Sequence, residues 1–120
     1  MGFRNIRRSN VVAPNDTLVD KEKYAVKITG DLVDTEGEFV YGIVSAGRAA
    51  DYASEIIIYG ECEAYCDGST ASDGPIAAGD GLKASTGGKL KKATEGTDAF
   101  HIVAKEAVTA ASSAATVFIY

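Results

Sequence analysis

The stretch from Ile76 to Tyr120 constrains the fold most, because short alternating runs of apolar residues are separated along it by breaks rich in small residues. Gly87 and Gly88 stand between two such runs, and a Gly-Gly pair suits the tight turn of a β-hairpin because it accepts positive φ without a Cβ clash. Ala110–Ala115 has no large side chain, so it can connect two strands but bury little. Thr116–Tyr120 is β-branched and aromatic, which favours a strand. The stretch therefore predicts strands joined by turns.

The preceding part of the chain continues this pattern. Lys23–Thr29 places apolar side chains at every second position, and Phe39–Val44 is an apolar run. Glu55–Cys66 is the longest predicted strand. Together these patterns predict seven short strands and almost no helix, which is typical of a small β-barrel or β-sandwich. We therefore expect a mainly β, β-tulip-like body over residues 23–120, preceded by an extended N-terminal arm over residues 1–22.

The net charge of −5 is unevenly distributed over the 120 residues. Residues 1–13 contain three arginines and no acid, whereas residues 16–80 contain four basic and fourteen acidic side chains. Residues 81–120 contain five basic and three acidic side chains. A basic arm on an acidic body indicates docking onto an acidic surface, either of another protein or of a neighbouring copy. The alternative is a solvated tail that only aids solubility.

The first fifteen residues show neither a helical nor a strand period, and their few hydrophobes cannot form a core. These hydrophobes can instead anchor an extended segment on another surface. The residues that we predict to bind another surface through this arm are Phe3, Arg4, Ile6, Arg7, Arg8, Val11 and Val12.

Three consecutive isoleucines, Ile56, Ile57 and Ile58, open the longest predicted strand. Successive side chains of a strand point to opposite faces, so the three cannot all face one core. Either both faces are buried by this chain, or one face is covered by a partner. The second alternative predicts an oligomer interface at these residues, and we expect a homotrimer.

No catalytic or metal-binding constellation is evident. Gly79-Asp80-Gly81 lacks the lysine and following helix of a phosphate-binding loop, so it predicts a turn. Asp67–Asp73 offers carboxylates and hydroxyls to calcium but lacks the EF-hand spacing. His101 is the only histidine and has no nucleophile at a recognisable spacing. We therefore expect no enzyme activity and no metal or other cofactor.

The remaining polar features have simple explanations. Lys89, Lys91 and Lys92 lack the interleaved aromatics of an oligonucleotide-binding surface, so no nucleic-acid partner is expected. Cys62 and Cys66 are four residues apart, which in a strand places them about 13 Å apart, too far for a disulfide. We expect both thiols to be reduced and partly buried. No membrane span or secretory signal is expected, because no long apolar run occurs.

Several segments resemble a known family when taken in order. They are Gly42–Asp51, Ile76–Ala84, Gly88–Ala93, Val103–Ala107 and the final Val117–Tyr120. Over about residues 39–120 this layout is similar to the head decoration (cement) proteins of tailed phages. The resemblance implies a small β-rich protein with an N-terminal arm that binds the major capsid protein as a trimer. It also implies that the protein is made in the host cytoplasm and lies on the outer surface of the virion.

The resemblance leads to one main hypothesis and one alternative. The main hypothesis is a structural virion protein that binds the assembled icosahedral capsid and stabilises it. Weak contacts from arms and bodies of an oligomer would add up through multivalency. The alternative is a virion adhesin or carbohydrate-binding β module, although the chain has no Trp to form an aromatic platform for sugars.

Overall fold

The computed structural model describes residues 6–13, 15–70, 73–94 and 96–120, and their fold is mainly β, as the sequence predicts. The described elements are β1 (Arg7–Val12), the 3-10 helix η1 (Asp16–Leu18), β2 (Ala25–Val26), β3 (Gly42–Ala46), β4 (Ala53–Asp67), β5 (Gly81–Ala84), β6 (Leu90–Lys92), β7 (Ile102–Ala104) and β8 (Ser113–Ile119). These ranges contain no α-helix, and none of their helical residues form a segment long and apolar enough to span a membrane.

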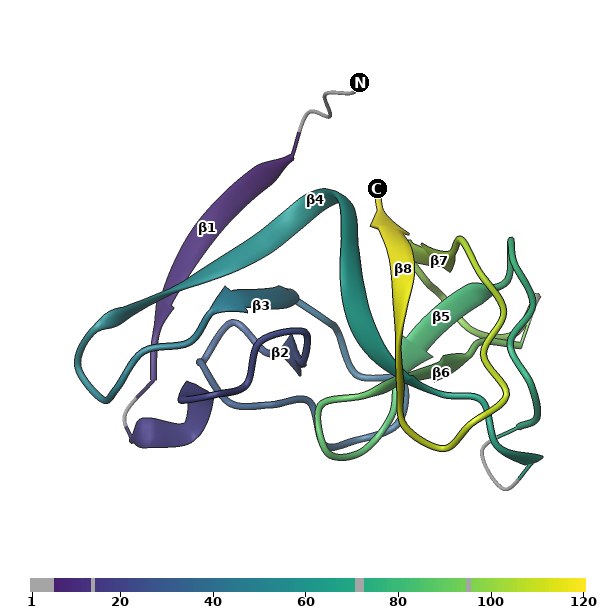
Figure 1. Cartoon of the computed structure of the whole chain (residues 1–120), viewed down its shortest axis with the longest axis horizontal. Coiled ribbons are helices and arrows are strands. Elements are labelled where there is room, and N and C mark those ends of the chain that lie inside the picture. The colour runs from purple at the N-terminus through teal and green to yellow at the C-terminus, as the bar shows by residue number, and fades with distance from the viewer. Residues whose placement is uncertain (1–5, 14, 71–72, 95) are drawn as a thin grey trace.

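Five strands close into a small mixed barrel in the order β4-β6-β5-β7-β8, with β8 returning to β4 (Figure 1). The β4–β6 pair is parallel and the other four pairs are antiparallel. Apolar side chains from these strands fill the interior as one group, which we call the barrel cluster. Its fully buried members include Cys66, Leu82, Leu90, Ile102, Val117 and Ile119.

A second layer is built on the first half of β4. There β1 and β3 pair antiparallel with β4 on its two sides, and β2 pairs with β3. A separate set of buried residues, which we call the N-terminal cluster, lies under this layer. It comprises Val11, Ala13, Leu18, Val26, Val44 and Ile56.

The strand β4 belongs to both layers and holds them together. It is 15 residues long and was the longest strand predicted, which the structure confirms. The strand arches between the two layers in Figure 1. Gly60 lies where the pairing with β1 gives way to the pairing with β8, and its φ of +108° is a conformation that only glycine adopts without strain. A side chain here would oppose the bend that lets one strand serve two sheets.

The turn predictions for the C-terminal half are confirmed. Gly87 and Gly88 have φ of +67° and +79° in the loop that joins β5 to β6 as an antiparallel hairpin. Asp80 forms a turn in which its carboxylate accepts a hydrogen bond from the Ala77 N–H at 2.8 Å. Both results follow from local residue chemistry, which is why they could be predicted without tertiary information.

Three details of the N-terminal half differ from the prediction. The described residues form eight strands rather than seven, because Arg7–Val12 is a strand. The strand predicted over Lys23–Thr29 is reduced to Ala25–Val26, since the chain turns back where the Lys27 N–H donates to the Asp31 carbonyl. The turn leaves Ile28 69% exposed. The strand predicted from Phe39 begins only at Gly42.

Candidate binding surfaces

The predicted capsid-binding arm is, where it is described, an edge strand of the body. Phe3 and Arg4 lie outside the described residues. Ile6 is half-buried and packs against the barrel cluster. Val11 is only 6% exposed and belongs to the N-terminal cluster, whereas Val12 is 54% exposed. The residues from Ile6 to Ala13 therefore contribute to the core of their own chain, and Val12 remains available to a partner.

The two described arginines of the arm have different surroundings. The guanidinium of Arg8 forms an ion pair with Glu55 of the neighbouring strand at 3.2 Å. Arg7 lies over the ring of Tyr59, 5.7 Å from its centroid, a cation–π geometry. The acidic surface that the sequence led us to expect opposite the arm is thus present in part within the same chain, at Glu55.

The isoleucines predicted to form an oligomer interface have cover from this chain. Ile56 is fully buried in the N-terminal cluster, and Ile57 is 9% exposed in the barrel cluster on the opposite face of β4. Ile58 is half-buried and packs against the N-terminal cluster. Burial on both faces by one chain was the first of the two alternatives for this motif. The homotrimer and its interface at these isoleucines remain predictions.

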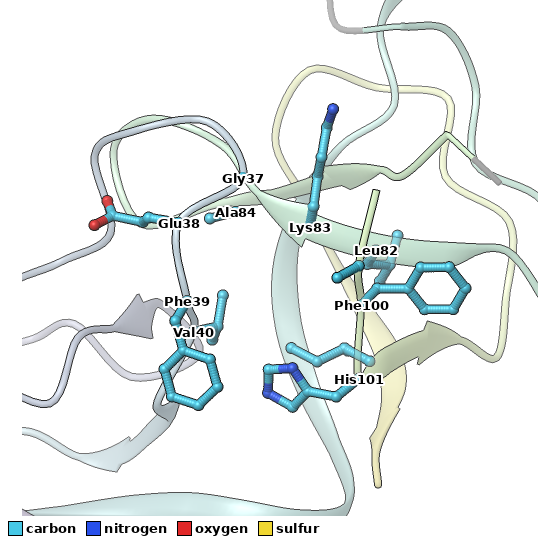
Figure 2. A pocket seen from close by; sticks show the side chains of 11 residues that line it. Gly37, Glu38, Phe39, Val40, Leu82, Lys83, Ala84, Phe100 and His101 are labelled. Atoms are coloured by element: carbon cyan, nitrogen blue, oxygen red, sulfur yellow. The ribbon is translucent and has the colours of Figure 1, made fainter. Parts of the chain in front are cut away.

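A groove of about 420 Å³ lies between the loop before β3 and the start of β7 (Figure 2). Phe39 and His101 stand at its opening, with ring centroids 5.2 Å apart and planes inclined by 17°. Leu82, Ala84 and Ile102 are buried residues that contribute to its wall. Phe39 is 67% exposed, which is unusual for a phenylalanine. The groove can accommodate an apolar or ring-shaped group.

Two lysines beside this groove are almost completely buried. Lys83 and Lys91 lie on β5 and β6, with side chains only 8% and 9% exposed. Glu36 bridges them, at 3.0 Å from Lys83 and 2.9 Å from Lys91. Asp98 completes the surroundings of Lys83 at 2.9 Å, and Asp73 those of Lys91 at 3.0 Å. These ion pairs thus hold the loops that contain Glu36, Asp73 and Asp98 against the β5–β6 hairpin. They also neutralise the two lysine charges that an anionic ligand could otherwise bind.

This ion-pair network predicts a loss of stability in acid. Hydrogen bonds from Lys91 and Lys83 lower the pKa of Glu36 below its ordinary value of 4.5, so folding favours the ionised carboxylate. A lowered pKa in the folded state contributes stability above pH 4.5 that is lost as the pH falls through the folded value. We expect Glu36→Gln to reduce the difference in unfolding free energy between pH 7 and pH 3, measured by urea denaturation. An unchanged pH dependence would contradict this role, and Glu63→Gln, which removes an exposed ion pair with Lys23, is the matched control.

The other features singled out in the sequence form no reactive site in the described residues. Burial, followed by the nearby acids, raises the pKa of Cys62 and of Cys66 to about 12, so both free thiols are protonated at neutral pH and poor nucleophiles. Asp67 accepts hydrogen bonds from Ser69 in its own loop. No group of three or more potential metal ligands occurs in the described part of the chain.

Sequence reasoning missed the groove and its paired rings. Phe39 was placed inside a strand, and His101 was treated as an isolated residue. The two lie on different segments and meet only because β5 pairs with β7 while the Gly37 N–H donates to the Ala84 carbonyl. A large apolar residue next to a glutamate-rich turn was the one local signal that Phe39 could be exposed.

Comparison with known proteins gives one structural likeness. No protein-family model and no curated protein sequence matches the chain. The chain is similar to the crystal structure of the head fiber gp8.5 N base in bacteriophage phi29, with a TM-score of 0.59 and 13% sequence identity. The match covers 96% of this chain and 94% of that one. It therefore extends over the barrel and the N-terminal layer together, and it establishes a shared fold.

Proposed function

We propose that this chain is a structural protein of a phage head, bound to the outside of the capsid. The observation that carries the proposal is the end-to-end likeness to a phage head fiber base, which spans nearly all of both chains. The independent resemblance of residues 39–120 to phage decoration proteins also supports a protein of the phage head. A compact β body whose buried charges are paired within the chain suits a structural role.

The finer proposal is that the protein acts as an oligomeric cement, with the major capsid protein as its partner. Several copies that each make a modest contact can hold a capsid surface firmly, because the second contact of a linked assembly forms at high effective concentration. We propose that the protein forms a homotrimer, and that each copy contacts the capsid through residues 1–5 and the exposed side of β1. The ion pair between Arg8 and Glu55 leaves Arg7 as the described arginine of the arm that is best placed to bind a carboxylate of the capsid.

Removal of residues 2–5 tests the role of the arm. We expect this truncated chain to fold like the full chain and to bind heads at least about 10-fold more weakly, since it loses Phe3 and Arg4. Binding is measured by co-sedimentation with heads that lack this protein, and folding by thermal unfolding. Deletion of residues 1–15 is unsuitable, because it would also remove β1 and the buried Val11.

The control for this experiment is the variant Ile28→Ala, which changes an exposed side chain on a turn of the body. Equal binding by the full and the truncated chain would exclude residues 2–5 from the contact. Failure of the full chain itself to bind heads would refute the proposed function.

The groove at Phe39 favours a second candidate function, a glycan-binding module on the virion surface. The exposed ring of Phe39, at the mouth of an apolar groove, can stack against the apolar face of a sugar. A screen of glycans by calorimetry distinguishes the two functions. Binding of a glycan by wild type that is lost in Phe39→Ala would support this candidate.

A further inference from the structure

Three aromatic side chains form a row on the outer side of the barrel, which we call the aromatic face. It consists of Tyr59, Phe118 and Tyr120, together with Val103 beside them. The rings of Tyr59 and Phe118 meet edge to face with centroids 5.7 Å apart, and those of Phe118 and Tyr120 stack at 6.4 Å. Tyr59 is 38% exposed and Tyr120 is 54% exposed. The row is thus preorganised by ring contacts, with Tyr59 and Tyr120 open to solvent and Phe118 half-buried between them.

Strand register places this row outside the barrel. Val117 and Ile119 of β8 are buried, so Phe118 between them points to the opposite side. Phe118 lies opposite Val103 on β7 and opposite Glu61 on β4. The end of β8, the bend of β4 and the start of β1 gather at the upper side of Figure 1.

A shallow hollow of about 580 Å³ adjoins the row, between Phe118, Val103 and the turn at Ala78–Gly79. Lys105 lies at its edge and binds Glu61 at 3.2 Å. At the other end Arg7 rests on Tyr59, and its guanidinium has no carboxylate partner among the described residues. The aromatic face therefore combines an apolar centre, a recess for one side chain, and the guanidinium of Arg7 at its edge.

The charge of the surrounding segments distinguishes this face from the rest of the molecule. Residues 16–80 hold fourteen of the seventeen acidic side chains, and the whole chain carries −5. Val103, Phe118 and Tyr120 of the aromatic face come instead from residues 81–120, which carry net positive charge, and Arg7 at its edge comes from β1 in the basic N-terminal segment. An acidic partner would be repelled by most of the body and attracted here, which fixes the orientation of docking.

We propose that the body docks onto the phage head through the aromatic face. Its partner there is an acidic protein surface that carries exposed apolar side chains. The partner would insert one apolar side chain into the hollow beside Phe118 and present a carboxylate to Arg7. Buried aromatic anchors surrounded by a charged rim are the usual source of binding energy in protein interfaces. The inference rests on the proposed function and adds the contact surface to it.

The test compares two pairs of matched variants in head binding. Tyr120→Ala and Phe118→Ala alter the aromatic face, whereas Tyr52→Ala and Ile28→Ala alter exposed apolar side chains elsewhere, at 68% and 69% exposure. We expect each change on the face to weaken binding by about 30-fold, as for an interface hot spot, and each control by less than about 2-fold. Arg7→Glu should weaken head binding by a larger factor at low salt than at high salt, because salt screens the charge. Circular dichroism melting checks that each variant is folded; Tyr120→Ala keeps the test valid if Phe118→Ala unfolds.

Each outcome is decisive. Wild type that binds heads while Tyr120→Ala binds equally well overturns the aromatic face and leaves the proposed function intact. Wild type that does not bind heads refutes the function and this inference with it. The mass of the free protein, measured over a concentration series, gives the remaining outcome. Self-association that Tyr120→Ala abolishes, with head binding unchanged, would assign the face to contacts between copies and overturn the proposed partner.

Discussion

Replacing Ile57 by Asp is expected to destabilise the protein strongly, with a loss of about 4 kcal/mol or more in the free energy of unfolding. Ile57 is 9% exposed and belongs to the barrel cluster. The change removes about 1.5–3 kcal/mol of side-chain burial and adds the larger cost of a carboxylate in an apolar site. Small domains have only about 5–15 kcal/mol of stability in total, so this loss would be a large fraction of it.

The matched control is Ile28→Asp, the same substitution at a side chain that is 69% exposed. It is expected to change stability by less than about 0.5 kcal/mol. Urea denaturation measures the stability of both variants, and analytical ultracentrifugation measures their mass. A folded Ile57→Asp chain with the wild-type midpoint but a smaller assembly would show that Ile57 covers a contact between copies instead.

Gly68→Ala is expected to cost about 3 kcal/mol, because the backbone after β4 touches the segment before β8. A Cβ at this position would lie 2.1 Å from the Val108 carbonyl oxygen, and the Gly68 N–H donates to the Ala110 carbonyl at 2.8 Å. Backbone atoms cannot rotate aside as a side chain can, so the two segments must separate. The midpoint of urea denaturation measures the effect.

Gly87→Ala is the control for this substitution. Gly87 has φ of +67° with open space where its Cβ would lie, so alanine there bears only the cost of a left-handed backbone, about 1 kcal/mol. Equal losses for the two variants would contradict the close approach at Gly68.

The sequence predicted most reliably those elements whose signals are local. The Gly87-Gly88 hairpin, the turn at Asp80 and the long strand through Ile57 each depend on residues that are adjacent in the chain. The strand β1 left no such signal, because as an edge strand it buries only Val11 of its six residues. Its pairing with β4 supplies the rest of its stability, and pairing partners cannot be seen in the segment itself.

The candidate surfaces were harder to predict for the same reason. The rings of Phe39 and His101 meet across a long separation in sequence, and the aromatic face depends on the register between β4 and β8. Alternation along β8 could indicate that Phe118 and Tyr120 point outward, but only tertiary structure brings Tyr59 beside them. The burial of both Ile56 and Ile57 could likewise not be predicted, because each side chain packs into a different cluster and both clusters are built from segments that are distant in sequence.

The bend of β4 at Gly60 also determines how the protein comes apart. One continuous strand carries Ile56 of the N-terminal cluster and, beyond the bend, Cys66 of the barrel cluster. If either cluster unfolds, the part of β4 that it holds is released, and the other cluster depends on the same strand. The two halves should therefore melt together in a single cooperative transition, and a mechanical pull on β1 would load the barrel as well.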